Sequence, residues 1–429
     1  MAVAASLVPP ELLTPVKAEL SNGLRVRLLP DPDSRVVSVQ TFFRVGSRDE
    51  RPGRTGIAHL FEHLMFNGAT KYGPKEFDRA IEEQGGSSNA YTSNDVTVYH
   101  EEAPAEALEL LLDLEFDRMG GLALSDASLA AEREVVKEER RLRVEDSVMG
   151  LVDEELQALV YREHPYRWPV IGWPADLDRI SLADCRDFFA RYYAPTNATL
   201  VIAGGFDPAR ALAIIERDHG RLPRGPPIES PPNEEGEQRG ARRAVVRHPS
   251  QAPLLVLALR APAAREPASA ELDLLQAILS FGDGSLLVRD LVHERGLVTE
   301  IGVDYAWRLG PAAFEIVAEL PPGGDPERVL REIWRHLERL AEKGPSARQL
   351  SRAKLQSQVA LLRELSSVGG RAHSLGSAEI LLGGLEPAVR IGERSERVTL
   401  RSAREAARAT FRPERSSVVF LEPLAEPAE

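Results

Sequence analysis

The sequence changes character once, at residues 223–243, and this break divides the chain into two halves of similar length. The segment, PRGPPIESPPNEEGEQRGARR, is rich in proline, glycine and charge and has almost no apolar side chains. Such a composition predicts a linker that is extended where its prolines cluster. We therefore expect an N-terminal domain over 15–222, an interdomain linker over 223–243 and a C-terminal domain over 244–425.

The two halves repeat the same order of expected elements. Each begins with strand-like runs, LRVRLLP and VVSVQTFFRVG in the first half and RAVVRH and PLLVLALRA in the second. Each continues with an apolar helix that ends near glycine and closes with a helix, an aromatic turn and a last strand. Strands mixed with long helices predict an α+β fold of two duplicated domains, each a sheet with helices packed on one face.

The charge of the chain limits the classes of partner. Its 429 residues include 53 Lys+Arg and 66 Asp+Glu, a net charge of −13. This balance disfavours nucleic acid or an anionic membrane as the main partner. It is still compatible with a local basic surface inside a cavity. No apolar run approaches the roughly 18 residues of a membrane span. The N-terminus lacks a basic signal-peptide region, so we expect a cytoplasmic location, or a periplasmic one if a signal peptide was removed.

Residues 55–66, TGIAHLFEHLMF, combine two histidines and a glutamate at helical spacing. Thr55 is the expected helix cap, and His59 and His63 are then one turn apart on one face, with Glu62 beside them. Two imidazoles so placed can both reach one zinc ion at roughly 2.0–2.1 Å. Glu62 is left free to activate water, and this H-x-x-E-H order is a known zinc-peptidase signature. The alternative interpretation is a pair of helix histidines with Glu62 as their ion partner.

A catalytic zinc ion needs a third protein ligand, and the segment ASLAAEREVVKEERRLRVED offers carboxylates on an expected helix. Glu139 shares a stripe with Val135, Val136 and Leu142, so we expect it on an inward, apolar face. An inward carboxylate is costly unless a metal or another charge compensates it. Glu139 is therefore the predicted ligand, and Glu132, seven residues earlier, is predicted to orient a histidine. Most other charges of this run are expected on a solvated face.

The runs HLFEH, GSSNAYTSNDVTVYH and EREVVKEER together resemble the pitrilysin-type metallopeptidases, which include insulin-degrading enzyme and the mitochondrial processing peptidase. The 76 residues between His63 and Glu139 are close to the separation in that family. The similarity extends from about residue 17 to the C-terminus and weakens after the linker. The resemblance implies the pitrilysin/LuxS-like α+β fold with mainly antiparallel sheets, one zinc ion per chain, and peptide cleavage inside a chamber formed by two two-domain units.

The resemblance also implies a place for the substrate. In the family, the strand that carries an Asn-Ala pair binds the peptide as an added edge strand, and here that pair is Asn89-Ala90. Edge addition gives main-chain hydrogen bonds with little sequence preference. From the residues alone, GSSNAYTS would be an ordinary turn and strand start.

Two departures from the family concern the second half. When its helix ending FGDG is matched to the one ending FNG, the positions of the metal site become Leu274, Ala277 and Ile278. Active members also carry an Arg and a Tyr seven residues apart in the C-terminal domain, and here Val292 and Thr299 stand at those positions. Arg295 and Tyr305 are near but out of register.

These departures lead to a hypothesis about partners. Since oxyanion donors are worth on the order of 3–4 kcal/mol each, we expect a heterodimer in which a homologous metal-free subunit supplies the Arg and Tyr, with a homodimer as the alternative. The expected activity is that of a zinc metalloendopeptidase. The competing interpretation is a non-catalytic core subunit of a larger complex, and a metal hydrolase acting on another substrate has no specific support.

Overall fold

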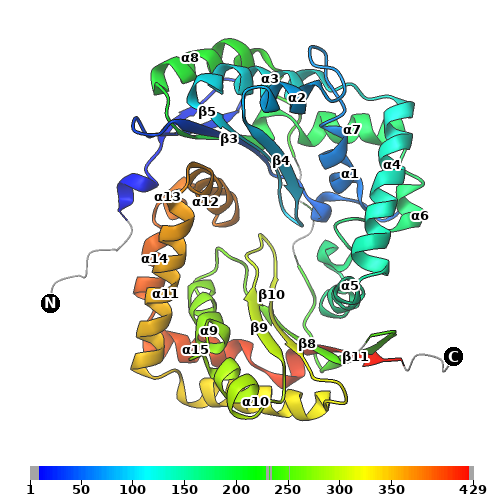
Figure 1. Ribbon diagram of the computed structural model, residues 1–429, viewed down its shortest axis with the longest axis vertical. Coiled ribbons are helices and arrows are strands. Elements are labelled where there is room, and N and C mark those ends of the chain that lie inside the picture. The colour runs from blue at the N-terminus through cyan, green and yellow to red at the C-terminus, as the bar shows by residue number, and fades with distance from the viewer. Residues whose placement is uncertain (1–8, 229–230, 232–233, 251, 425–429) are drawn as a thin grey trace.

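The computed structural model describes residues 9–228, 231, 234–250 and 252–424, which form two sheets surrounded by helices (Figure 1). Residues 1–8, four residues of the expected linker (229–230 and 232–233) and positions 251 and 425 of the expected C-terminal domain lie outside the described residues. The two sheets confirm the α+β expectation, one sheet coming from each half of the sequence.

The first half forms a six-stranded sheet in the order β1-β2-β6-β3-β5-β4. Neighbouring strands are antiparallel except for the parallel pair β2 and β6. The strands are β1 Val16–Glu19, β2 Arg25–Pro30, β3 Val36–Phe43, β4 Ser87–Thr92, β5 Thr97–Pro104 and β6 Ala198–Gly204. Because β4 is the last strand of this sheet, one of its edges has no neighbouring strand.

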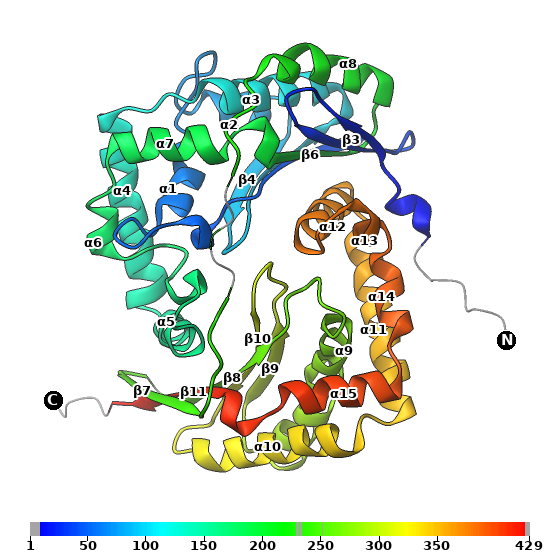
Figure 2. The same cartoon turned by 180° about the vertical axis from the view of Figure 1, so that it is seen from behind.

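Helices of the first half pack mainly against one face of that sheet, and Figure 2 shows α3, α7 and α8 on this side. The alternation of β2 explains the choice of face, since Val26 and Leu28 join the core under these helices while Arg25 and Arg27 point the other way. The helices are α1 Ile57–Leu64, α2 Glu76–Glu82, α3 Leu108–Gly121, α4 Asp126–Arg140, α5 Val148–Val160, α6 Pro174–Leu177, α7 Leu182–Tyr192 and α8 Pro208–Asp218.

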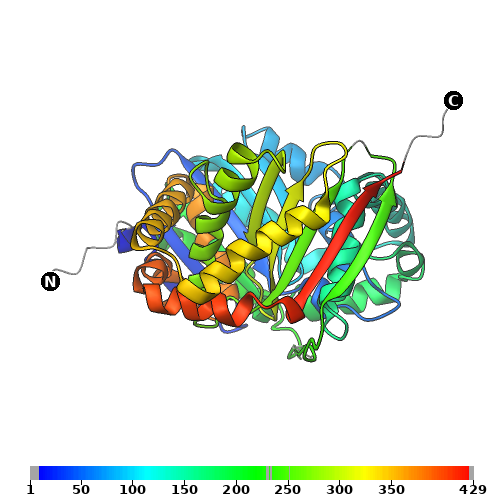
Figure 3. The ribbon, with the colours of Figure 1, turned by 90° about the horizontal axis from the view of Figure 1, so that it is seen from below.

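The second half forms a five-stranded sheet in the order β7-β11-β8-β10-β9, with β7 and β11 as its parallel pair. Figure 3 shows α10 lying across this sheet. The strands are β7 Arg242–His248, β8 Leu254–Ala261, β9 Glu300–Tyr305, β10 Ala312–Glu319 and β11 Ser416–Pro423. The helices are α9 Ser269–Ser280, α10 Pro326–Lys343, α11 Ala347–Leu365, α12 Val368–Leu381, α13 Leu385–Val389, α14 Ile391–Arg397 and α15 Leu400–Thr410.

Each half also contributes a helix to the other half. Helix α12 packs on the second face of the first sheet, and α5 packs on β7, β8 and β11 of the second sheet. The sequence predicted helices on one face only, but both faces of these sheets carry apolar side chains that need a cover. A buried ion pair joins the halves at this point, where the Arg27 guanidinium donates to Glu379 of α12 at 2.8 and 2.5 Å.

The segment between the halves is held against both of them. The carboxylate of Glu235 accepts hydrogen bonds from the amides of residues 162–164 and pairs with Arg260 of β8. The side chain of Gln238 donates to the carbonyl of Ser416. Strand β7 begins at Arg242, two residues before the expected start of the C-terminal domain at 244. No helix among the described residues is long and apolar enough to cross a membrane.

Candidate metal centre

Helix α1 begins differently from the sequence prediction. Its cap position is Gly56, with a φ of 87° that favours glycine, and its first amides are bonded by Glu50. The Glu50 carboxylate accepts from the amides of Gly56 and Ala58, each at 2.9 Å. Thr55 was predicted as the cap, but its hydroxyl donates to Asp176 at 2.8 Å instead. A buried carboxylate from the preceding loop therefore fixes the start of the helix that carries the histidines.

The three predicted ligands come together between α1 and α4. Nε2 of His63 is 3.2 Å and Nε2 of His59 is 3.6 Å from Oε2 of Glu139. Ligand atoms at roughly 2.05 Å from a tetrahedral zinc ion are about 3.3 Å from one another. The observed separations are therefore close to those of a zinc site. One ligand atom from each of these three residues lies within 4.8 Å of the other two.

The two imidazoles differ in their electrostatics. Burial lowers the pKa of His59 to about 4, although the charge of Glu139 opposes this. Burial acts in the same direction on His63, but hydrogen bonds with Glu132 and Glu139 outweigh it and raise the pKa to about 9. The same hydrogen bonds lower the pKa of the Glu132 and Glu139 carboxyl groups, since each contacts His63. Two imidazoles and two carboxylates this close together form a donor set that suits a divalent ion.

Glu132 contacts the other nitrogen of His63, with Oε2 at 3.3 Å from Nδ1. Glu132 was predicted to orient a histidine, and a carboxylate in this position could do so if His63 held a metal ion. Asn67, which the sequence did not single out, also hydrogen bonds to Glu132. On the other ligand, Arg143 lies 3.1 Å from Oε1 of Glu139 and leaves Oε2 directed at the imidazoles.

The face of α4 that carries Glu139 is less apolar than the sequence predicted. Val136 is buried, but Val135 is 49% exposed and Leu142 is 61% exposed. The buried stripe of α4 consists of Leu129, Val136 and Arg140, and the two glutamates lie beside that stripe. Leu142 belongs to a π-helical turn over Arg141–Glu145, which shifts the register that a regular helix would have continued.

Glu62 lies beside the three ligands without being one of them. Burial raises the pKa of this carboxyl group. Its Oε2 is buried and has no hydrogen-bond partner among the described residues. Thr92 at the end of β4 partly offsets this rise in pKa, and the sequence analysis did not single it out. An orphaned carboxylate oxygen next to a metal-type donor set is suited to accept a proton from water.

The predicted substrate residues Asn89 and Ala90 lie on β4, whose outer edge is free and which packs beside α1. The amide of Ala90 donates to the side-chain oxygen of Asn89 at 2.8 Å. A side-chain acceptor of this kind can move aside, so the edge can accept an added strand.

The corresponding edge of the second half is closed. β9 is the last strand of its sheet, but its amides at Val303 and Tyr305 donate to the side chains of Ser280 and Gln276 on α9. The three positions predicted to replace the metal site on α9, Leu274, Ala277 and Ile278, are all buried in the apolar core. Val292 and Thr299, at the predicted Arg and Tyr positions, precede β9.

Comparison with protein families gives two matches along the chain. The profile described as Insulinase (Peptidase family M16) matches residues 25–172, which include the two histidines and the three glutamates of the candidate site. The profile described as Peptidase M16 inactive domain matches residues 179–357, which include the apolar positions of α9.

Individual relatives agree with these matches. The zinc protease PqqE of Helicobacter pylori is 31% identical over 353 residues, which cover 81% of this chain and 79% of that protein. The crystal structure of a protease from Helicobacter pylori has a TM-score of 0.90 at 28% identity and covers 95% of this chain and 99% of its own. The β subunit of the mitochondrial-processing peptidase of Neurospora crassa is 28% identical over 227 residues, 52% of this chain and 48% of that subunit.

Proposed function

We propose that this chain, which belongs to the insulinase family of peptidases (family M16), is a zinc metalloendopeptidase that cleaves peptides or unfolded polypeptides. The observation that carries the proposal is the convergence of His59, His63 and Glu139 at separations near those of a tetrahedral zinc site. The likeness to a zinc protease over most of the chain supports it.

Zinc held by the three ligands would act as a Lewis acid and lower the pKa of water toward 7. Glu62 accepts a proton from the attacking water and passes it to the nitrogen of the leaving amine. The raised pKa of Glu62 suits both steps. A carboxylate with a higher pKa is a better base, and a carboxyl group whose pKa is closer to neutral pH holds its proton long enough to act as an acid. Glu132 holds the His63 ring through Nδ1, which keeps Nε2 directed at the ion.

The peptide is bound along the free edge of β4, with main-chain hydrogen bonds at Asn89 and Ala90. Thr92, at the end of the same strand, is close enough to Glu62 to lower the pKa of its carboxyl group. A bound strand and the proton acceptor are therefore positioned by the same element. This mode of binding predicts little dependence on substrate sequence.

We also propose that the chain works as one subunit of a heterodimer. The chain lacks the Arg and Tyr at 292 and 299, so a homologous subunit without a metal site supplies the oxyanion donors in a heterodimer. The similarity to a protein named as a β subunit supports this arrangement over a homodimer. The cytoplasmic location expected from the sequence is part of the same proposal.

Replacing Glu62 with Gln separates catalysis from metal binding. We expect Glu62→Gln to lower kcat by about 10²–10⁴-fold, because the proton acceptor is lost, while the zinc content stays near one per chain. Peptide cleavage and metal analysis on the same sample measure the two effects. A variant that keeps its activity would refute the assigned role, and a wild-type chain that binds zinc but never cleaves peptide would favour the non-catalytic alternative.

The need for a partner predicts low activity for the chain alone. Peptidase activity of the purified chain should rise by about 10²-fold or more when the metal-free homologue is added, since an oxyanion donor is worth on the order of 3–4 kcal/mol. The donor side chains of the homologue provide the control, because replacing them should remove the gain. Full turnover by the isolated chain would contradict the heterodimer.

A further inference from the structure

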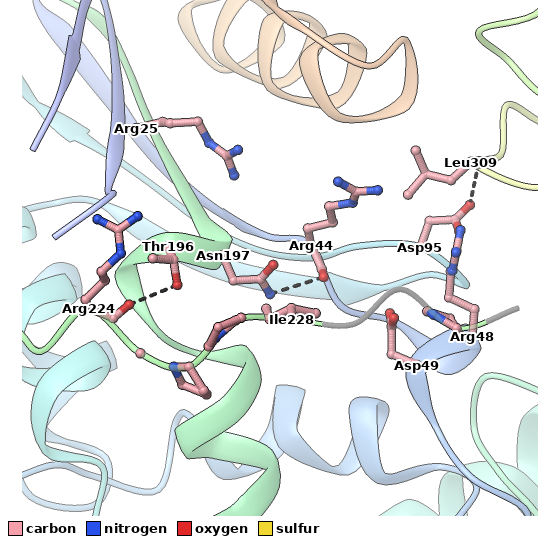
Figure 4. A pocket seen from close by; sticks show the side chains of 14 residues that line it. Arg25, Arg44, Arg48, Asp49, Asp95, Thr196, Asn197, Arg224, Ile228 and Leu309 are labelled. Atoms are coloured by element: carbon pink, nitrogen blue, oxygen red, sulfur yellow. Dashed lines mark hydrogen bonds and ion pairs between the residues drawn. The ribbon is translucent and has the colours of Figure 1, made fainter. Parts of the chain in front are cut away.

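A cavity of about 470 Å³ lies where the sheet of the first half ends, between the strands and the proline-rich segment that follows α8. Figure 4 shows four arginines along it, Arg25 at the start of β2, Arg44 after β3, Arg48 in the next turn and Arg224 at the beginning of the interdomain segment. Leu309, from the loop between β9 and β10 of the second half, closes one end. None of these residues belongs to the metal centre.

The carboxylates of the cavity do not balance these four cations. Asp95 is fully engaged, because it accepts hydrogen bonds from Arg48, from the hydroxyl of Tyr166 and from the amide of Leu309. Asp49 accepts from the amide of Gly46, and burial raises its pKa to about 7. Among the described residues of the cavity wall, Arg25, Arg44 and Arg224 therefore face at most one opposing charge, and Glu379 and Glu19 act on Arg25 from outside the wall.

The three remaining arginines keep donors available. The Arg44 guanidinium makes no hydrogen bond or ion pair with the described residues. Among the described residues, Arg25 bonds only through Nε, which donates to Thr199 at 3.0 Å, and Arg224 makes one bond of 3.4 Å to the carbonyl of Ser21. In Figure 4 the guanidinium groups of Arg25 and Arg44 extend into the same open space. In a chain with a net charge of −13, such a local excess of free donors needs an explanation.

We propose that this cavity binds a small phosphate-bearing ligand, with Arg25, Arg44 and Arg224 as its donors. A volume of about 470 Å³ lies within the range of small-molecule sites and is too small for a folded partner. Guanidinium groups match phosphate oxygens in pairs, and a row of three suits two linked phosphates better than one carboxylate. Linker residues such as Pro226 and Ile228 give the cavity an apolar wall against which an organic group could pack.

Calorimetric titration of the full chain with inorganic pyrophosphate at pH 8 and constant ionic strength tests the site. We expect saturable binding with one site per chain, a Kd at least about tenfold weaker in Arg44→Ala and in Arg25→Ala, and a Kd about threefold tighter in Asp49→Asn, which removes an opposing charge. Arg339→Ala is the matched control, because it deletes one exposed positive charge on α10 and should leave the Kd unchanged.

Two results would overturn the proposal. One is binding that is absent at millimolar pyrophosphate, or equal in the wild type, Arg44→Ala and Arg339→Ala, since this would be general charge attraction. The other concerns Glu229, the residue after Ile228 in the sequence. If Glu229→Gln binds pyrophosphate and the wild type does not, the arginines are neutralised by a carboxylate of the chain itself and not by a ligand. Peptidase activity is not needed as a readout, so the result stands apart from the function proposed above.

Discussion

His219 is a titratable side chain that the fold buries without a hydrogen-bonding partner. The ring is fully buried and lies edge-on to Phe116 at 5.8 Å between centroids. Neither ring nitrogen has a hydrogen-bond partner among the described residues. Burial lowers the pKa of the imidazole to about 4, against a small opposing effect of Asp218. The folded chain therefore holds the neutral ring, whereas the unfolded chain protonates it near pH 6.5.

This difference predicts a loss of stability in mild acid. As the pH falls from about 6.5 toward 4, the unfolded chain binds one more proton than the folded chain, so the free energy of unfolding decreases. His219→Leu should remove this component, on the order of 2–3 kcal/mol at pH 4.5. Urea unfolding of both proteins between pH 8 and 4.5 measures it, and His293→Leu, at a half-exposed position, is the control. An unchanged pH dependence in His219→Leu would show that the ring has another partner.

The proximity of the candidate ligands was predictable where short-range spacing determines the geometry. His59, Glu62 and His63 share one helical turn, so a sequence of five residues fixes their arrangement. Glu139 was found through its helix and the family resemblance, although the apolar stripe used in the argument was partly misjudged. Glu50 and Thr92 could not be found, because each reaches the site from a separate loop or strand and neither has a distinctive pattern.

At the scale of elements, α12 depends on close contact with the sheet beneath it. Gly376 lies over Phe42 of β3, and a β-carbon at this position would overlap the aromatic ring. The helix can approach the strands this closely because glycine has no side chain. Glycine at position 376 therefore allows close packing of the helix on the sheet, although glycine is a poor helix former.

Gly376→Ala should consequently destabilise the protein by about 1–3 kcal/mol, since overpacking exceeds the gain of about 1 kcal/mol that alanine brings to a helix. Guanidinium unfolding measures the change. Gly302→Ala on β9, where a β-carbon meets nothing within 4 Å, is the control and should have little effect. If the α12 variant were as stable as the wild type, the helix would have room to move away from the sheet.

The elements themselves were largely predictable, but their partners were not. The runs at LRVRLLP and PLLVLALRA became β2 and β8, and the two apolar helices became α1 and α9. By contrast, nothing in residues 148–160 or 368–381 indicates that each helix packs on the sheet of the other half. An amphipathic pattern specifies that a face is buried and leaves open which surface covers it.

Each half supplies a helix, α5 or α12, to the core of the other half, so we expect the two halves to unfold together. Each sheet has one face covered by a helix from the other half, and the buried Arg27–Glu379 pair joins them. Neither half alone can therefore complete its core, and removing one partner of a buried ion pair costs several kcal/mol.

We therefore expect one cooperative calorimetric transition for the full chain rather than two. Residues 1–222 expressed alone should show weak near-ultraviolet circular dichroism and bind a hydrophobic dye. Co-expression with residues 223–429 should restore the folded signal, which provides the control. Two independent transitions, or a compact first half without its complement, would contradict this dependence.

The closed edge of β9 has a consequence for self-association. A molecule with two unpaired sheet edges can bind another chain at each edge, and repeated pairing of this kind builds a fibre. Here Ser280 and Gln276 already satisfy the outward amides at one end. Intermolecular pairing is therefore hindered along β9, which leaves β1, β4 and β7 as the edge strands of the two sheets and removes one of the contacts from which a fibre could grow.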